Sequence, residues 1–315
     1  MGSDMVTLNL VIPCFNEEGA LPLTIPRVQA LLDKLERDGV VASGSGAVFV
    51  DDGSSDDTWR LISEWHVRDT RLHGIKLSRN EGHQHALLAG LLNTEGDVLI
   101  SMDADLQDDL DAIPRMLAEH KAGADIVFGV RSNRDSDTWF KRVTAHAYYR
   151  LLGKLGAEIV PDHADFRLMS RRALKALELF SEVNLFLRGV IPLLGLKTAR
   201  VEYVRHERVA GVSKYPFMKM ATLAFDGITS FSARPLQWSI YVGAFLSFAS
   251  MIAGLWAIFI RVFTDQGVPG WASTVIPMYF LGGVQLLFLG VIGGYVAKIY
   301  AETKRRPRFI IEQKI

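Results

Sequence analysis

Short apolar runs alternate with amphipathic stretches over the first two-thirds of the chain. The apolar runs predict buried strands at 8–12, 47–50, 72–77, 97–102 and 125–130. Between them, apolar residues recur at helical spacing, which predicts helices over 21–37, from 54 to about 67, from 83 to about 92 and over 110–121. This alternation is typical of an α/β fold with a doubly wound, mostly parallel sheet.

The pattern changes after residue 130. Helical spacing dominates from 138 to about 194, and a short strand is expected at 201–204. The segment 216–231 then mixes apolar and basic residues, which is typical of a helix lying along a membrane surface. We therefore expect a globular domain over 1–213, followed by an interfacial helix within 214–234.

Two long uncharged stretches follow this segment. No charged residue occurs from 235 to 260 or from 266 to 297, and a membrane-spanning helix needs about 20 apolar residues. The alternative is a pair of helices buried in a soluble core, but such helices rarely run so far without a charge. We expect a transmembrane hairpin within 235–315, with helices at about 237–260 and 275–297 and a basic cytoplasmic tail.

Basic residues lie outside this hairpin on both sides. Lys214, Lys219 and Arg234 precede it, and Lys298 and the cluster at 304–308 follow it. By the positive-inside rule, both termini and the globular domain would lie in the cytoplasm. The expected location is the cell inner membrane, which the chain would cross more than once.

The total charge and the cysteine content further limit the class of protein and the compartment in which it works. The 315 residues contain 35 Lys and Arg and 35 Asp and Glu, so the chain has no signature of nucleic-acid binding. The single cysteine, Cys14, excludes an intrachain disulfide and fits a reducing compartment.

Four predicted strands end in polar, oxygen-rich loops, which begin at Pro13, Asp51, Arg79 and Asp103. Parallel strands bring such loops to one edge of the sheet, where open α/β sheets bind ligands. No G-x-G-x-x-G follows the first strand and no Walker lysine is present, which argues against a dinucleotide-binding dehydrogenase and a P-loop enzyme. Acidic loops of this kind suit a nucleotide whose diphosphate is held by a metal ion.

The fourth of these loops contains Asp103-Ala104-Asp105-Leu106-Gln107. Two carboxylates and an amide oxygen make a hard-oxygen set suited to Mg²⁺ or Mn²⁺, usually shared with substrate phosphates. A lone D-x-D is weak support, because acidic pairs also cap helices and solvate turns. The neighbouring loops strengthen the prediction of metal ligands at Asp103, Asp105 and Gln107.

Six motifs follow one another in order between residues 12 and 216. They read IPCFNEE, DDGSSDDT, SRNEGHQ, MDADLQD, HADFRLMSRRAL and RHERVAGVSKYP. The set resembles the polyisoprenyl-phosphate glycosyltransferases of glycosyltransferase family 2, which include bactoprenol glucosyl- and N-acetylglucosaminyltransferases and, more distantly, dolichol-phosphate mannosyltransferase. The resemblance implies a GT-A fold that transfers a sugar, with inversion, from a nucleotide diphosphate to a membrane lipid phosphate such as undecaprenyl phosphate.

The resemblance also implies roles for individual residues. The residues expected to bind the nucleotide are Pro13, Asn16, Glu17, Asp51, Asp52 and Asp103. Those expected to bind the metal are Asp103, Asp105 and Gln107. The residues expected to bind phosphate are Arg131, Arg205, Arg208, Ser213 and Lys214. Asp165 and Arg131 are the expected catalytic residues. Many relatives have Phe at the position of Glu81 and Pro at that of Asp109, and these departures leave the sugar and the nucleotide open.

Several alternatives remain open at this level. Asp165 is a base, a sugar contact or only a helix N-cap, and His83 and His85 fit polar surface or substrate contacts better than metal ligands. The donor is UDP-glucose, UDP-N-acetylglucosamine or a GDP-mannose type. A different class is an inactive membrane scaffold for a partner flippase. We also expect a homo-oligomer, with a tetramer as one candidate, and a flippase as a candidate partner of the active enzyme.

Overall fold

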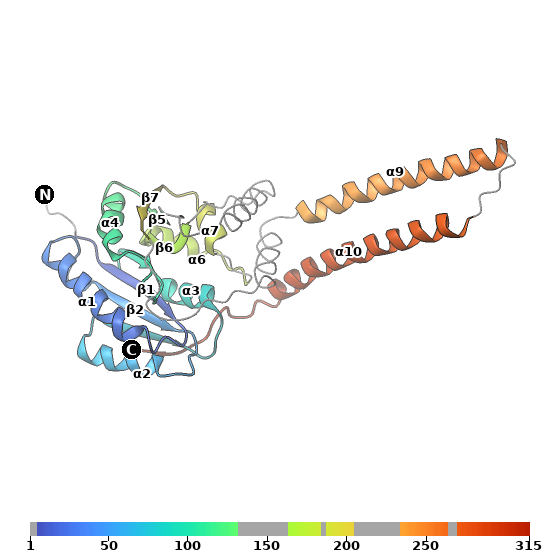
Figure 1. The fold of residues 1–315 in the computed structure, drawn as a ribbon. Coiled ribbons are helices and arrows are strands. Elements are labelled where there is room, and N and C mark those ends of the chain that lie inside the picture. The colour runs from blue at the N-terminus through green and yellow to red at the C-terminus, as the bar shows by residue number, and fades with distance from the viewer. Residues whose placement is uncertain (1–4, 132–162, 184–186, 205–233, 264–269) are drawn as a thin grey trace. The chain divides into compact units, whose positions relative to one another are not determined.

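The structure is a computed structural model that describes residues 5–131, 163–183, 187–204, 234–263 and 270–315. The chain divides into two compact units (Figure 1). The first comprises Met1–Leu151, Glu158–Pro216 and Arg306–Ile315, and the second comprises Leu152–Ala157 and Phe217–Arg305. The interfacial helix predicted at 216–231 lies outside the described residues.

The first unit is built on a mixed sheet of eight described strands in the order β7-β5-β6-β4-β1-β2-β3-β8. In chain order the strands are β1 Leu8–Cys14, β2 Gly46–Asp51, β3 Leu72–Leu77, β4 Val98–Ser101, β5 Ile126–Arg131, β6 His163–Ser170, β7 Thr198–Tyr203 and β8 Ile311–Lys314. The pairs β1–β2, β1–β4, β2–β3 and β5–β7 are parallel. The predicted α/β sheet, mostly parallel and wound in both directions from β1, is confirmed.

Helices pack on this sheet between successive strands. They are α1 Leu21–Arg37, α2 Thr58–Arg68, α3 His83–Asn93, η1 Leu110–Ala112, α4 Ile113–Lys121, α6 Arg171–Glu178 and α7 Leu187–Leu193. The central strands are continuous apolar runs because both of their faces are covered, and Leu10, Ile12 and Phe49 are all buried in the core. Because β1 pairs parallel with both β2 and β4, the carboxyl ends of these three strands lie at one edge of the sheet.

Strand β6 corrects the prediction of mostly helical structure from 138 to 194. It lies between β4 and β5 and is antiparallel to both, with Arg167 opposite Ser101 on β4. Phe166 and Leu168 enter the hydrophobic core, and Asp165 and Arg167 pair with each other while buried. Helices α6 and α7 agree with that prediction. The strand was missed because two charged residues indicate a solvated face unless their pairing is known.

Strand β8 is an edge strand that the sequence analysis did not anticipate. It pairs antiparallel with β3, with Lys314 opposite Ile75 and Ile311 opposite Leu77. The backbone pairing continues beyond the strand, since Ile315 and Gly74 exchange two hydrogen bonds of 3.0 and 2.9 Å. The last residues of the chain are therefore part of the sheet of the first unit.

The second unit contains two long helices, α9 Arg234–Phe263 and α10 Trp271–Thr303, which lie side by side (Figure 1). Within them, Ser239–Trp256 and Phe280–Thr303 are long and apolar enough to cross a membrane. Large apolar side chains such as Phe245 and Leu286 are exposed along them. The helices agree with the predicted spans in length and composition, and the membrane topology stays a prediction.

Candidate active site

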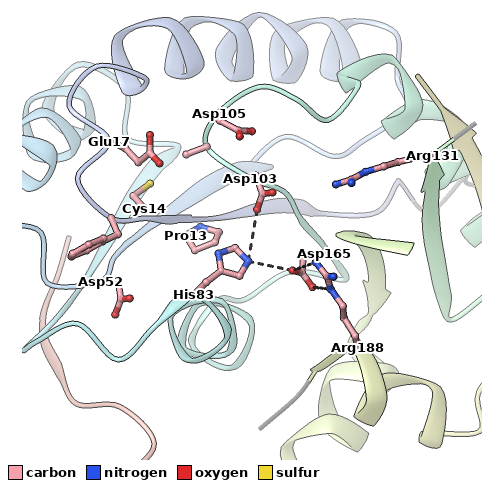
Figure 2. A pocket seen from close by; sticks show the side chains of 12 residues that line it. Pro13, Cys14, Glu17, Asp52, His83, Asp103, Asp105, Arg131, Asp165 and Arg188 are labelled. Carbon is pink, nitrogen blue, oxygen red and sulfur yellow. Dashed lines mark hydrogen bonds and ion pairs between the residues drawn. The ribbon is translucent and has the colours of Figure 1, made fainter. Parts of the chain in front are cut away.

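A cavity of about 350 Å³ opens where the carboxyl ends of the central strands meet (Figure 2). Its lining comes from all four predicted polar loops and from β5, β6 and α7. The residues that line it are Pro13, Cys14, Phe15, Glu17, Asp52, His83, Asp103, Ala104, Asp105, Arg131, Asp165 and Arg188. Six are acidic or basic residues named by the sequence analysis: Glu17, Asp52, Asp103, Asp105, Arg131 and Asp165.

Asp52 is held in this cavity by the loop that follows β3. Its carboxylate oxygens accept hydrogen bonds of 2.8 Å from the Glu81 N–H and 2.9 Å from the Gly82 N–H. The approach of the two loops requires Gly53, which has φ +66° and whose added Cβ would lie 2.5 Å from a backbone atom of Arg79. Burial raises the pKa of Asp52 above its ordinary value, against the effect of these hydrogen bonds.

Asp51 and Asn16, also predicted to bind nucleotide, support the cavity without lining it. The buried Asp51 carboxylate accepts a 3.1 Å hydrogen bond from the Ser54 N–H, and burial raises its pKa. Asn16 adopts φ +54°, a conformation that asparagine tolerates. Its amide oxygen accepts from the Ser55 N–H at 2.9 Å and its backbone N–H donates to Ser54 Oγ at 3.0 Å. Asn16 thereby joins the first two loops.

Asp103 and Asp105, the predicted metal ligands, both line the cavity. Burial raises the pKa of Asp103, and the charges of Asp165 and Asp105 raise it further, although His83 opposes them. Gln107 is buried and absent from the lining, and its backbone N–H donates to Asp105 Oδ1 at 3.2 Å. Over the part of the chain that the structure describes, no group of three or more His, Cys, Asp or Glu residues is arranged to hold a metal ion.

The two carboxylates nevertheless fit a hard divalent ion. Mg²⁺ is commonly held by one or two carboxylates, and substrate phosphates and water complete its coordination. Asp103 and Asp105 supply such a pair at an open cavity, and their mutual repulsion is relieved by a bound cation. The geometry therefore fits a metal shared with substrate and not an ion enclosed by protein ligands.

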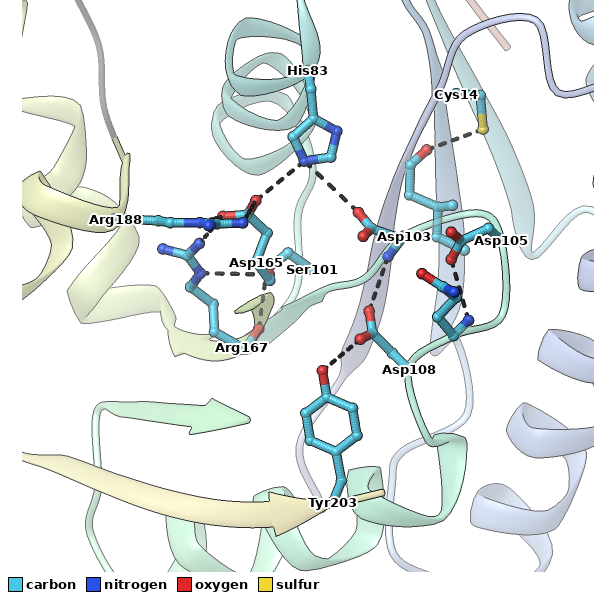
Figure 3. Close-up of polar contacts among 12 residues, drawn as sticks. Cys14, His83, Ser101, Asp103, Asp105, Asp108, Asp165, Arg167, Arg188 and Tyr203 are labelled. Carbon is cyan, nitrogen blue, oxygen red and sulfur yellow. Dashed lines mark hydrogen bonds and ion pairs between the residues drawn. The ribbon is translucent and has the colours of Figure 1, made fainter. Parts of the chain in front are cut away.

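Asp165 lies at the centre of a cluster of cationic side chains (Figure 3). Its Oδ1 accepts from Arg167 Nη2 and, at 3.2 Å, from Arg188 Nε. Its Oδ2 accepts from Arg188 Nη2 at 2.9 Å and lies 3.4 Å from His83 Nε2. Burial would raise the pKa of Asp165, but the hydrogen bond with His83 and the charges of Arg167 and Arg188 outweigh burial and place it well below its usual range.

His83 bridges this cluster to Asp103, one of the two predicted metal ligands. Its Nε2 lies 3.4 Å from Asp165 Oδ2 and 3.7 Å from Asp103 Oδ1. Burial would lower its pKa, but the hydrogen bond to Asp165 and the charge of Asp103 raise it overall. His83 lines the cavity, and its role as a polar or substrate contact stays a prediction.

A second buried link connects the loop after β4 to β5 and β7. Asp108 accepts a 2.7 Å hydrogen bond from the Tyr203 hydroxyl and a 3.3 Å hydrogen bond from the Asp103 N–H. Arg131 Nε donates to the same hydroxyl at 3.5 Å. Burial and the charge of Asp103 raise the pKa of Asp108 to about 6. These contacts set the positions of Asp103 and Arg131 relative to each other.

Arg188, Asp108 and Tyr203 were not among the residues predicted from the sequence. Their partners are far away in the chain: Arg188 is 23 residues from Asp165, and Tyr203 is 95 residues from Asp108. No local pattern indicates such pairs. The predicted phosphate-binding residues Arg205, Arg208, Ser213 and Lys214 lie outside the described residues.

The fold is that of a GT-A glycosyltransferase. Among solved structures, mannosyl-3-phosphoglycerate synthase of Rubrobacter xylanophilus matches with a TM-score of 0.50, covering 84% of this chain and 78% of that one at 16% identity. At this identity the likeness shows the fold alone. The sequence matches the family description "Glycosyl transferase family 2" over residues 9–178. The chain belongs to glycosyltransferase family 2, as its motifs indicated, and is an enzyme of that class.

Curated relatives match over nearly the full length. An uncharacterized glycosyltransferase of Bacillus subtilis, YkoT, is 46% identical over 99% of this chain and 93% of its own. The bactoprenol glucosyl transferase of Shigella phage SfX is 40% identical over 98% and 99%, respectively. A prophage bactoprenol glucosyl transferase homolog of Escherichia coli is 38% identical over 97% and 98%. The similarity therefore includes the two C-terminal helices.

Proposed function

We propose that the protein transfers a hexose from a UDP-sugar to a polyisoprenyl phosphate, such as undecaprenyl phosphate, at the cytoplasmic face of the membrane. The observation that carries this proposal is the similarity to the SfX bactoprenol glucosyl transferase, which is 40% identical over 98% of this chain. The charged cavity and the two apolar helices support it, because the reaction joins a soluble nucleotide sugar to a membrane lipid.

The nucleotide sugar would bind along the acidic loops. Pro13, Glu17 and Asp52 line the cavity at the end suited to the nucleoside, with Asn16 and Asp51 behind them. Asp103 and Asp105, with Gln107 as the third predicted ligand, would hold Mg²⁺ or Mn²⁺ against the diphosphate. The ion would stabilise the negative charge of the departing nucleoside diphosphate.

The lipid phosphate would act as the nucleophile. A phosphomonoester has a second pKa of about 6, so it is largely dianionic at neutral pH and needs no strong base. The remaining obstacle is the approach of one anion to another, which fixed cations ease. Arg131 lines the cavity, and Arg205, Arg208, Ser213 and Lys214 are the further phosphate-binding residues of the proposal. In-line attack at the anomeric carbon inverts its configuration.

The proposed arrangement at the membrane follows from the same sequence features. Residues 1–213 would form the cytoplasmic catalytic domain, 214–234 an interfacial helix, and 235–315 the hairpin with its tail. A homo-oligomer and a flippase that moves the product across the membrane complete the proposal. The C-terminal residues 306–315 belong structurally with the catalytic unit.

The experiment that tests this function is radiolabelled sugar transfer by the detergent-purified full chain. UDP-glucose, UDP-N-acetylglucosamine and GDP-mannose are offered in parallel with undecaprenyl phosphate and Mg²⁺ or Mn²⁺, with EDTA as the control. Label entering a lipid that mild acid releases identifies both the reaction and the sugar. Transfer from GDP-mannose alone would support a mannosyltransferase instead. No transfer, combined with no nucleotide binding, would support the scaffold alternative.

A further inference from the structure

We propose that Arg188 binds the phosphate group of the acceptor and that Asp165 positions it. This inference rests on the proposed function, because it takes a lipid phosphate as the acceptor. It assigns Arg188 a role in substrate binding, and it replaces the base or sugar-contact role of Asp165 with that of an anchor.

The first observation is the way Asp165 holds Arg188. Both oxygens of the carboxylate face the guanidinium, with Oδ1 at 3.2 Å from Nε and Oδ2 at 2.9 Å from Nη2. This two-point contact fixes the plane of the guanidinium as well as its position. The Arg188 side chain remains 38% exposed and lines the cavity (Figure 2). It is therefore both fixed and accessible to a substrate.

The second observation is the charge balance around Asp165. The carboxylate also contacts Arg167, whose side chain is fully buried. One carboxylate between two guanidinium groups leaves a net positive charge on the trio. Arg167 has no exposure to solvent and the Asp165 side chain only 7%, so Arg188 is the member of the trio that is most exposed to the cavity. The arrangement presents a positive charge to the cavity.

The same contacts make Asp165 a poor general base. Both of its oxygens already accept from arginine or contact His83. A proton placed on Asp165 would leave the buried Arg167 without its counter-charge, which is costly. A largely dianionic phosphate also has little need to lose a proton. Asp165 is better suited to ordering the cations around it.

The third observation is the position of Arg188 along the cavity. Figure 2 shows Asp52 and Glu17 on one side and Arg131 and Arg188 on the other, with Asp103 between them. A nucleotide sugar with its nucleoside at Asp52 and its diphosphate at Asp103 would direct the sugar toward the two arginines. An acceptor phosphate that attacks the sugar from that side would meet Arg131 and Arg188 together.

The test compares the purified full-length variants Arg188→Gln and Arg188→Lys with the wild type, using undecaprenyl phosphate and the preferred nucleotide sugar. The loss of a charge-assisted hydrogen bond predicts that Arg188→Gln raises the KM for the lipid phosphate about 10- to 100-fold and changes the KM for the donor less than about twofold. Arg188→Lys keeps the positive charge but loses the two-point contact of the guanidinium, so its KM for the lipid phosphate should lie between those of the wild type and Arg188→Gln. Arg172→Gln is the matched control, since Arg172 is 74% exposed and pairs with Asp125.

The variant Asp165→Asn tests the anchoring role. We expect a similar rise in the KM for the lipid phosphate, and a double variant with Arg188→Gln that is no worse than the more impaired single variant. Loss of kcat alone in Asp165→Asn, with an unchanged acceptor KM, would identify Asp165 as a base and overturn the inference. Thermal unfolding identifies a misfolded Asp165→Asn, in which case the Arg188 variants decide the matter.

Two further results would also overturn the inference. A rise in the donor KM alone for Arg188→Gln would place Arg188 with the nucleotide sugar, and wild-type values for both substrates would remove it from binding altogether. In either case the wild type still transfers sugar, so the proposed function stands. If the wild type transfers no sugar to undecaprenyl phosphate, the proposed function fails and the inference fails with it.

Discussion

Asp103 and Asp105 occupy a turn whose shape depends on several neighbouring groups. Leu106, between Asp105 and Gln107, has φ +56°, and the Gln107 N–H donates to Asp105. The Asp103 N–H donates to Asp108, which Tyr203 holds from β7. The two cavity carboxylates are therefore placed by contacts from both sides of the loop. A substitution of Asp105 also removes the hydrogen bond from the Gln107 N–H, so its effect on folding has to be measured beside its effect on activity.

We expect Asp105→Ala to lower sugar transfer at least about 100-fold, because a metal ligand that stabilises the leaving diphosphate is worth several kcal/mol. The measurement is the transfer assay over a series of Mg²⁺ and Mn²⁺ concentrations, with thermal unfolding as the check on folding. Asp111→Ala is the control, since Asp111 is exposed and lies outside the cavity lining. Near wild-type transfer by Asp105→Ala would remove the metal assignment.

The buried Asp108 gives a pH-dependent prediction. Its pKa is raised to about 6 in the folded protein, so between pH 4 and 6 the folded state binds more protons than the unfolded state. This contribution lowers stability as pH rises through that window. Asp108→Asn removes it, so the free energy of unfolding of the variant relative to wild type should rise by about 2 kcal/mol from pH 4 to pH 7. A pH-independent difference between the two proteins would refute the assignment.

Helix α3 packs on the sheet through a glycine. An added Cβ on Gly90 would lie 2.3 Å from Val11 Cγ1 and 2.8 Å from Val50 Cγ2, so the helix backbone lies directly over β1 and β2. We expect Gly90→Ala to destabilise the protein by about 1–3 kcal/mol through overpacking. Chemical denaturation measures the change. Gly19→Ala is the control, because an added Cβ there meets no atom within 4 Å, and equal stability of the two variants would contradict the packing argument.

Strand β8 covers the edge of the sheet next to β3. Lys76 and Glu312 form an ion pair of 3.0 Å across the two strands, and Arg308 donates to the Phe180 carbonyl at 2.7 Å. The residue before the strand contacts the segment that leads to the cavity, because the Ile310 carbonyl accepts a 3.0 Å hydrogen bond from the Ser78 N–H, just before the loop that holds Asp52.

Deletion of residues 310–315 should therefore destabilise the catalytic unit, although no proposed catalytic residue is removed. The loss of the paired edge and of the two hydrogen bonds between Ile315 and Gly74 predicts a cost of about 2 kcal/mol or more. The measurements are thermal unfolding and nucleotide binding, and we expect a lower unfolding temperature and weaker binding. Lys314→Ala, which removes only an exposed bond to Asn93, should have little effect. Wild-type stability after the deletion would show that β8 is dispensable.

At the scale of the whole chain, the catalytic unit is interrupted by the two long helices and resumes after them. A hairpin that crosses the membrane twice returns the chain to the side from which it left. The return of residues 306–315 to the catalytic sheet is consistent with this path, because both flanks of the hairpin then belong to one folded unit.

This path predicts the accessibility of introduced cysteines. Gly270→Cys, between the helices, should react with a membrane-impermeant maleimide from outside intact spheroplasts, and Lys304→Cys should react only in inverted vesicles. The native Cys14 is buried and should not interfere. Labelling of Lys304→Cys from outside would reverse the orientation, and equal labelling of both positions from one side would argue against two spans.

The local pattern of apolar and polar residues was sufficient to predict many of the helices and strands. The strands from Leu8 to Arg131 and the helices between them are near their predicted bounds, because each buries an apolar run or stripe that is visible in consecutive residues. The two long apolar helices follow from length and charge alone. The polar residues Glu17, Asp52, Asp103 and Asp105 were also predictable, since strand ends in a parallel sheet converge on one edge.

Tertiary packing decided the rest. Strand β6 and the contacts of Asp165 with Arg167 and Arg188 depend on burial. Charged residues that would indicate a solvated face are instead buried and paired with opposite charges. Strand β8 depends on an unpaired edge of β3 more than 200 residues earlier, and the Tyr203–Asp108 contact spans 95 residues. Such long-range pairings leave no trace in local periodicity. Which polar residues face the cavity, and with what charge, is therefore a property of the folded sheet.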